Sequence, residues 1–427
     1  MSKTALLFPG QGSQYVGMGK SLYDSFEVAR QRFEEASEIL GFDLKRLCFE
    51  GSLEDLTQTG NTQPAILTAS IAAYEVYKKE IGIKPDYACG HSLGEISALV
   101  CSGAVAFGDA VKIVRQRGLL MQDAASAGTG AMAAVTGLDR DTIELECKKV
   151  SGEDYLVVIS NYNSPEQTVV SGHKKAVECV CTILTGLGAR IVPLKVSAPF
   201  HSPIMKSAAE RLIQELMKYK YNPLKVPVIS NVNALPYAGE TKIVETLTTQ
   251  ITSPVKWVES MNYLVQKGVT QAVELGPQTV LKNLMKKNAP VIITYAFDNE
   301  EDFKAIKNAN VSKDLNMAGG GKFVPTVVTK CIAIAVCTRN RNWDNEEYQK
   351  GVIDPYRRIQ QMQEEIEKEG RQPTLSEMKQ ALDMLMSVFI TKRTPVEEQI
   401  ERFNEVFDTT ATRELFSDFE LPKVNYV

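Results

Sequence analysis

The chain has 427 residues, of which 44% are hydrophobic and 23% are charged, and its formal net charge is −4. This composition is typical of a globular protein with two or three domains, or with one large domain that carries an insertion. The weakly acidic balance argues against binding to nucleic acid or to a membrane surface, and no apolar run reaches the roughly 20 residues of a transmembrane helix.

The eight cysteines are scattered, and the N-terminus lacks a signal-peptide pattern. The only close pair is Cys179-x-Cys181, with no second pair of cysteines or histidines behind it, which is poor support for zinc. We therefore expect reduced thiols, no metal site and a cytoplasmic location.

The first apolar run, residues 3–8, predicts a buried strand that ends in the loop Gly10-Gln11-Gly12-Ser13-Gln14. The loop does not fit a phosphate-binding pattern, because Gly-Lys-Ser/Thr and Gly-x-Gly-x-x-Gly are both absent. With Gln11 between two glycines, it is instead suited to presenting a backbone N–H to a developing oxyanion. Amphipathic helices are expected at 21–40 and 67–79, with Pro64 in the first turn of the second.

Residues 90–94 read Gly-His-Ser-Leu-Gly, the spacing of a sharp strand-to-helix turn that carries Ser92 at its tip. The two glycines are needed where backbone segments approach too closely for a Cβ. The flanks fit, because residues 83–88 are strand-like and a helix with Glu95 in its first turn follows. A nucleophilic serine is one interpretation, and a glycine-rich connection with an incidental serine is the other.

The pattern changes after the next expected helix, residues 109–121. Small residues at 126–130 predict a hinge, and the order strand, helix, strand, strand, helix, strand that follows is typical of a ferredoxin-like domain. Its expected strands are 131–136, 156–160, 168–171 and 189–194, and its expected helices are 139–150 and 173–187. After the small domain the chain returns to alternating helices and strands, which argues for a mostly parallel sheet covered on both faces. The expected helices are 204–219, 245–250 and 261–267, and the expected strands are 226–230, 272–275 and 291–295.

Three consecutive glycines at 319–321 indicate a flexible linker. Beyond them, residues 323–336 are apolar and β-rich, and three short amphipathic helices are expected. Their predicted starts are Asp354-Pro355, as an N-cap followed by proline, and capping-box patterns at Thr374 and Thr394. Their apolar faces are expected to pack on each other or on the core, with docking of a partner as the alternative.

These patterns predict a large domain at 1–127 and 197–310, a small domain at 128–196, a linker at 311–322 and a mainly helical extension at 323–427. The large domain would carry the chemistry.

A serine hydroxyl becomes a nucleophile when a base takes its proton, and the chain has three histidines. His91 adjoins Ser92, and adjacent side chains at such a turn usually diverge. His173 opens an expected helix of the small domain, where a solvated position is expected. His201 lies between two prolines in an apolar loop that re-enters the large domain, so it is the favoured base, with a buried structural histidine as the alternative.

Arg117 lies on the largely apolar helix expected soon after the serine turn. The planar guanidinium of arginine grips a carboxylate with two hydrogen bonds, so an inward-pointing Arg117 would hold an acyl group that carries its own carboxylate. Arg115, on the same helix, is expected to be an ordinary surface arginine, which shows that an arginine here need not be functional. Spacing alone leaves the role of Arg117 open.

Eight motifs are spread in order over roughly residues 1–300. They are Gly10-Gln11-Gly12-Ser13-Gln14, Thr62-Gln63-Pro64-Ala65, Gly90-His91-Ser92-Leu93-Gly94-Glu95, Arg117-Gly118, Asn161-Tyr162-Asn163-Ser164-Pro165, Pro199-Phe200-His201-Ser202-Pro203, Gln250 with Pro254-Val255-Lys256-Trp257, and Glu274-Leu275-Gly276-Pro277. In this combination the chain resembles the malonyl-CoA:acyl carrier protein transacylase family. The resemblance implies an α/β fold, with an α/β-hydrolase-like large domain and an inserted ferredoxin-like small domain.

Carried over to this sequence, the resemblance implies Ser92 as nucleophile and His201 as general base and acid. The backbone carbonyl of Gln250 would orient His201, so no acid partner is required, and the backbone N–H groups of Gln11 and Leu93 would hold the oxyanion. The implied substrate contacts are Arg117 on the malonyl carboxylate, Gln63 beside it, Phe200 as a ring that disfavours a methyl branch, and Asn161 and Asn163 near the cleft.

The implied activity is transfer of malonyl from malonyl-CoA to the phosphopantetheine thiol of an acyl carrier protein through a malonyl-Ser92 ester, without a cofactor. The implied setting is fatty acid, polyketide or lipopeptide biosynthesis. A serine hydrolase of the same fold that clears acyl groups from carrier proteins is the alternative, and it has no need of Arg117; a non-catalytic scaffold for carrier proteins is a third hypothesis. The extension departs from the plain family pattern and resembles the in-trans acyltransferases of bacterial polyketide and lipopeptide assembly lines.

Overall fold

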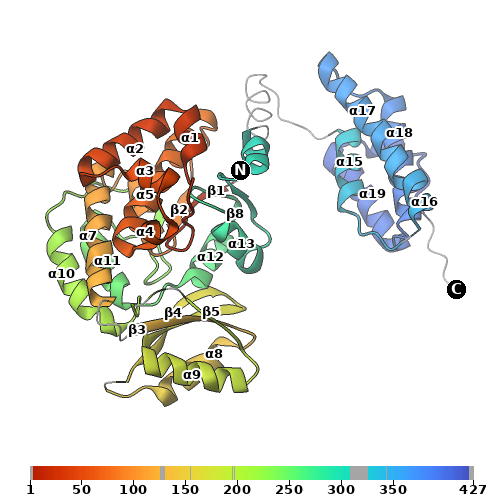
Figure 1. Ribbon diagram of the computed structural model, residues 1–427. Helices are drawn as coiled ribbons and strands as arrows, with labels where there is room; N and C mark the ends of the chain where they lie inside the picture. The colour runs from red at the N-terminus through yellow and green to blue at the C-terminus, as the bar shows by residue number, and fades with distance from the viewer. Residues whose placement is uncertain are drawn as a thin grey trace. The chain divides into compact units, whose positions relative to one another are not determined.

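The computed structural model describes residues 3–125, 130–153, 155–194, 196, 198–307, 326–342 and 344–422. The chain divides into two compact units, residues 1–312 and 313–427 (Figure 1). Within the described ranges, no helix is both long and apolar enough to cross a membrane.

The first unit is built around a parallel sheet whose strand order is β7-β2-β1-β8-β9. In chain order the strands are β1 (Lys3–Phe8), β2 (Tyr87–Gly90), β7 (Val228–Ile229), β8 (Val269–Glu274) and β9 (Ile293–Ala296). Leu6 and Phe8 of β1 enter one hydrophobic cluster, whereas Ala5 and Leu7 enter another. Since alternate residues of a strand face opposite sides, the sheet has a core on each face, as the sequence predicted.

Helices surround this sheet. Those before the small domain are α1 (Lys20–Ser25), α2 (Glu27–Leu40), α3 (Leu44–Glu50), α4 (Leu53–Thr57), α5 (Thr59–Glu80), α6 (Leu93–Cys101) and α7 (Phe107–Ala125). Those after it are α10 (Lys206–Leu216), α11 (Ile243–Thr252), α12 (Trp257–Gln266) and α13 (Val280–Asn288), with short 3₁₀ turns at Pro203–Met205 and Glu240–Lys242.

Two predictions for the helices that precede the small domain are wrong. The helix expected at 21–40 is two helices, because Phe26 between them has extended backbone, with φ −130° and ψ 120°. Pro64 is not in the first turn of its helix, since α5 already begins at Thr59. The N–H of Gly60 donates to Oε1 of Gln122 on α7 at 3.1 Å, so a tertiary contact holds the turn that precedes the proline.

The small domain has the predicted ferredoxin-like order. Its elements are β3 (Gly130–Thr136), α8 (Arg140–Val150), β4 (Val157–Ser164), β5 (Gln167–His173), α9 (Lys174–Gly186) and β6 (Arg190–Pro193). The strands pair antiparallel in the order β4-β5-β3-β6, and α8 and α9 lie on one face of this sheet (Figure 1). Most of the predicted hinge at 126–130 lies outside the described residues, and Gly130 is the first residue of β3.

The second unit is a set of helices with its own apolar core. It contains α15 (Val327–Cys337), α16 (Asn345–Tyr348), a π-helical turn (Gln349–Ile353), α17 (Asp354–Glu369), α18 (Leu375–Thr391), α19 (Val396–Thr410) and a 3₁₀ turn (Arg413–Phe416). The apolar faces of α15, α17, α18 and α19 share this core, so they pack on each other as expected. The predicted linker at 311–322 lies outside the described residues.

The β-rich expectation for 323–336 is wrong, because α15 occupies the described part of that segment. The buried residues Val327, Val328, Cys331, Ile334 and Ala335 follow a helical period and join the core of the second unit. Burial of one helical face thus outweighs the local preference of β-branched residues for strands.

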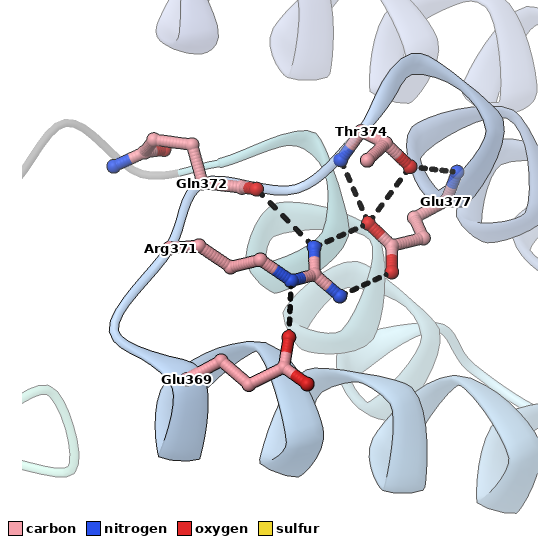
Figure 2. Close-up of polar contacts among 5 residues, drawn as sticks. All are labelled: Glu369, Arg371, Gln372, Thr374 and Glu377. Carbon is pink, nitrogen blue, oxygen red and sulfur yellow. Dashed lines mark hydrogen bonds and ion pairs between the residues drawn. The ribbon is translucent and has the colours of Figure 1, made fainter.

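The three helices predicted in the extension begin within one residue of their predicted starts, and one of the three predicted N-caps is confirmed. Thr374 accepts from the N–H of Glu377 and its own N–H donates to the Glu377 carboxylate, while Arg371 grips the same carboxylate with both Nη atoms (Figure 2). Asp354 is no N-cap, because it has helical backbone angles and directly follows the π-helical turn. Thr394 lies one residue too early, since Pro395 precedes the first residue of α19.

Candidate active site

Ser92 lies where β2 ends and α6 begins, with φ 52° and ψ −103°. Such a backbone conformation is rare for a residue with a Cβ and persists only where its surroundings enforce it. A Cβ on Gly90 would lie 1.8 Å from the carbonyl carbon of Gly94, and one on Gly94 would lie 1.9 Å from the carbonyl oxygen of Phe8. Both glycines are therefore required by the close approach of β1, β2 and α6, as the motif predicted.

The loop that follows β1 packs closely against the turn that carries Ser92. A Cβ on Gly10 would lie 2.4 Å from the carbonyl oxygen of His91, and this approach places Gln11 on the wall of the pocket around Ser92. Leu93 lines the same pocket from the first position of α6, where a backbone N–H has no acceptor within the helix. The structure thus brings the two residues expected to hold an oxyanion to the nucleophile.

His201 reaches Ser92 from the loop that leads back from the small domain. Its Nε2 lies 2.7 Å from Ser92 Oγ, and its Nδ1 lies 2.8 Å from the main-chain oxygen of Gln250. A carbonyl oxygen only accepts, so Nδ1 carries the hydrogen and the lone pair of Nε2 faces the serine hydroxyl. Burial and the nearby Arg117 cation lower the pKa of His201 to about 3, so the imidazole is neutral and ready to take a proton.

Arg117 points into the site from α7 and is 2% exposed. Its Nη1 donates to Gln63 Oε1 at 2.8 Å, and its Nη2 donates to Ser92 Oγ at 3.1 Å and to Gln250 Oε1 at 3.0 Å. Burial lowers the pKa of Arg117 to about 10, so it remains a cation at neutral pH. No carboxylate among the described residues lies within 4.0 Å of its guanidinium nitrogens, whereas Arg115 on the same helix is partly exposed and donates to Asn61.

Beneath the turn lies a buried polar network that the sequence reasoning did not assemble. The carboxylate of Glu95 accepts from the main-chain N–H of Asn231 at 2.9 Å, from Gln250 Nε2 at 2.7 Å and from the hydroxyl of Tyr237. Asn231 Oδ1 in turn accepts from the N–H of Ser92 at 2.7 Å. The network therefore holds the backbone of the nucleophile and the side chain of Gln250 together.

A pocket of about 170 Å³ opens above Ser92 between the two sheets. The predicted residues Phe200, Asn161 and Asn163 line it, together with Met132 and Val169 of the small domain. Asn163 Oδ1 lies 2.9 Å from Nε2 of His91, so that histidine joins the two domains rather than acting on Ser92.

All ten predicted site residues lie in or directly around this pocket, and Gln63 meets it through Arg117. The sequence analysis did not identify Asn231 and Tyr237 as residues of the site, nor Glu95 as a hydrogen-bond partner of Gln250. A signal for Asn231 was present, since it follows the strand-like run 226–230 and parallel strands end at the same edge of a sheet.

Comparison with known proteins agrees with this geometry. The acyl transferase domain model matches residues 5–292. A malonyl CoA-acyl carrier protein transacylase of Bacillus subtilis is 40% identical over 400 residues, which cover 94% of this chain and 99% of the relative. The transacylase of Escherichia coli K12 is 44% identical over 288 residues, covering 67% of this chain and 93% of the relative. The chain belongs to the malonyl CoA-acyl carrier protein transacylase family.

Solved transacylase structures share the fold. The acyl carrier protein S-malonyltransferase of Vibrio cholerae is 42% identical, with a TM-score of 0.69, over 71% of this chain and all of that one. A malonyl-transacylase in complex with its type II PKS acyl-carrier protein is 40% identical, with a TM-score of 0.70, over 72% of this chain and all of that one. The share of this chain that these structures cover is about the length of the first unit, whereas the 400-residue match to the B. subtilis relative must extend into the second.

Proposed function

We propose that this protein transfers malonyl from malonyl-CoA to the phosphopantetheine thiol of an acyl carrier protein through a malonyl ester on Ser92. The observation that carries the proposal is Arg117, a buried cation with no direct counter-ion in the described part of the chain, whose Nη2 lies 3.1 Å from the nucleophile oxygen. An acyl group bound to Ser92 would place a terminal carboxylate beside that guanidinium, which is suited to a two-point hydrogen-bonded grip.

In the first half of the reaction, Ser92 Oγ attacks the thioester carbonyl carbon while His201 Nε2 takes the hydroxyl proton. The carbonyl oxygen becomes an oxyanion that accepts from the N–H groups of Gln11 and Leu93. Such donors are each worth about 2.7–4 kcal/mol in comparable sites. The C–S bond then breaks, and CoA leaves as a thiol with the proton held by His201.

In the second half, the same groups work in reverse. The phosphopantetheine thiol gives its proton to His201 Nε2 and its sulfur attacks the ester carbon. The C–O bond breaks, and Ser92 recovers its proton as malonyl leaves on the carrier. Gln250 keeps Nδ1 protonated throughout, because its main-chain oxygen accepts at 2.8 Å.

The side chains around the acyl group are proposed to set its identity. Gln63 holds Nη1 of Arg117 at 2.8 Å, and Phe200 lies in the pocket wall where an α-methyl branch would have to fit. Asn161 and Asn163 line the small-domain side of the same pocket. We therefore expect malonyl to be preferred over methylmalonyl and over acyl groups that lack a carboxylate.

The biosynthetic setting is proposed from the second unit. We infer an in-trans acyltransferase that serves polyketide or lipopeptide carriers; the extension shared with the B. subtilis relative and the similarity to a transacylase solved with its type II PKS acyl-carrier protein support this. The cysteine side chains that the structure describes are free thiols, which supports a reducing compartment such as the cytoplasm. Transfer assays with several acyl-CoAs and carrier proteins, read by mass, would identify the partner.

The rival function is an acyl hydrolase built on the same Ser92 and His201, and Arg117→Ala separates the two. For the transacylase, malonyl loading should fall by about tenfold or more while acetyl loading is retained or improved, because a charged hydrogen-bonded clamp is removed. Loading of Ser92 is followed by intact mass, and Arg115→Ala is the matched control on the same helix. Unchanged handling of malonyl in Arg117→Ala would reject this role and favour the hydrolase.

A further inference from the structure

Glu95 is a buried carboxyl group that the two-step reaction does not use. It is 0% exposed, yet two N–H donors converge on its Oε2, from Asn231 at 2.9 Å and from Gln250 at 2.7 Å. The hydroxyl of Tyr237 meets its Oε1. Burying a carboxylate costs free energy unless it is paired or hydrogen-bonded. The three donors around Glu95 meet this requirement, and we therefore ask what the buried carboxyl group does there.

Glu95 is one of three groups that fix the orientation of the Gln250 amide, together with Arg117 and the main-chain oxygen of Ser92, which accepts from Gln250 Nε2 at 3.1 Å. Oε2 accepts from the main-chain N–H of Asn231, which makes it an acceptor toward Gln250 as well, so the NH₂ group of Gln250 must face Glu95. The amide oxygen of Gln250 then faces Arg117, whose Nη2 donates to it at 3.0 Å. If the amide turned over, its NH₂ group would meet the guanidinium, which has no acceptor to offer.

This arrangement places one neutral amide between the buried carboxyl group of Glu95 and the buried cation of Arg117. Burial raises the pKa of Glu95, while its three hydrogen-bond donors and the Arg117 cation act against that rise. A direct ion pair would compensate the charge of Arg117 but would occupy the hydrogen bonds that an incoming carboxylate needs. With the Gln250 side chain as spacer, Glu95 lies near Arg117 and favours its charged form without a direct ion pair, while the Nη2 atom stays at the pocket, 3.1 Å from Ser92 Oγ.

We propose that Glu95 is a positioning residue for malonyl selectivity: acting through the side chain of Gln250, it aims the Arg117 guanidinium at the carboxylate of the acyl group. This inference rests on the proposed malonyl transfer and deepens it. It also separates the tasks of Gln250, since its main chain holds His201 while its side chain binds Arg117 and the main-chain oxygen of Ser92.

The test compares malonyl with acetyl loading of Ser92 in Glu95→Gln, which removes the charge and keeps the shape. We expect kcat/KM for malonyl-CoA to fall by about tenfold or more through a higher KM, because a neutral amide at position 95 anchors the Gln250 side chain, and with it Arg117, less strongly than a carboxylate does. Acetyl loading should fall much less than malonyl loading, because an acetyl group has no carboxylate for Arg117 to hold. Gln250→Leu keeps the main-chain contact to His201 but loses the hydrogen bond from Gln250 Nε2 to the main-chain oxygen of Ser92. Both loading rates should therefore fall, and the malonyl-to-acetyl ratio should fall as in Glu95→Gln.

Two further variants separate positioning from a general effect on the fold. Because Glu95 acts through Gln250, the double variant Glu95→Gln/Gln250→Leu should lose no more selectivity than Gln250→Leu alone. Glu274→Gln is the matched control, since Glu274 is equally buried but accepts from the N–H groups of Leu281 and Lys282 at the start of α13. It is expected to lower stability without changing the malonyl-to-acetyl ratio.

Equal losses of malonyl and acetyl loading in Glu95→Gln, or additive losses in the double variant, would overturn the inference. If Glu95→Gln does not fold, the ratio in Gln250→Leu decides alone, and an unchanged ratio there overturns it. Failure of the wild-type protein to load malonyl at all would instead overturn the proposed function, and the inference with it.

Discussion

His201 is held in a setting that defines the pH range of the reaction. Its imidazole must be neutral to accept the Ser92 proton, and burial together with the Arg117 cation lowers its pKa to about 3. The fraction of neutral base therefore falls only at pH values well below the ordinary histidine range near 6.5. Arg117 thus acts on the base as well as on the substrate.

Replacing Arg117 by methionine removes the cation and should raise the pKa of His201. With acetyl-CoA, which needs no carboxylate clamp, the acid limb of the loading rate should lie well below pH 6 in the wild-type protein. In Arg117→Met the same limb should move to higher pH, whereas Arg115→Met should leave it in place. An acid limb at the same pH in the wild-type protein and in Arg117→Met would show that this cation does not control the base.

At the scale of elements, the catalytic turn depends on the absence of a side chain at Gly94. An added Cβ would lie 1.9 Å from the carbonyl oxygen of Phe8, so β1 and α6 would have to separate. We expect Gly94→Ala to destabilise the first unit by about 1–3 kcal/mol and to abolish most Ser92 loading, measured by thermal unfolding and intact mass. Gly152→Ala is the control, because a Cβ added there would meet none of the described atoms within 4 Å, and near-identical behaviour of the two variants would contradict this packing argument.

Helices and strands that are marked by residues close together in the sequence were predictable. The strand, turn and helix around Ser92 follow from glycine spacing and apolar runs, and the ferredoxin-like insertion follows from its alternation. The segment at 323–336 was not predictable in the same way, because β-branched residues there bury one face of a helix against partners such as Leu385 and Phe403, which lie far along the chain. Tertiary packing decides such cases.

The candidate site was predictable as far as motifs mark it. Ser92, His201, Arg117 and Gln250 were named from the sequence, and the structure brings them within hydrogen-bond distance of one another or of a shared partner. The hydrogen bonds that the buried Glu95 side chain accepts were not predictable. Its partners Asn231 and Tyr237 lie 136 and 142 residues away in the chain, and only the assembled sheet brings them to α6.

At the scale of the whole molecule, the acyl-transfer chemistry is expected to belong to the first unit alone. Every residue placed at the site lies between Gln11 and Gln250, and this unit has its own core through Ile306. Deletion of the chain after Asn316 should therefore leave malonyl loading of Ser92 within about twofold of the full-length rate, as read by intact mass. Loss of loading in the shortened protein would show that the second unit takes part in the acyl-enzyme step.

The same deletion addresses the role of the second unit, whose apolar faces share one core. If the extension docks a carrier, transfer to at least one carrier protein should fall while Ser92 loading persists. Unchanged transfer to every carrier tested would reject a docking role.

The central claim is that Ser92 carries the malonyl group between donor and carrier, and intact-mass measurement after mixing with malonyl-CoA tests it most directly. We predict a single malonyl adduct on the wild-type protein, its disappearance when a carrier with a free phosphopantetheine thiol is added, and a malonylated carrier in return. Ser92→Ala should show no adduct. An adduct that persists in Ser92→Ala, or one that is lost to water without appearing on any carrier, would contradict the account.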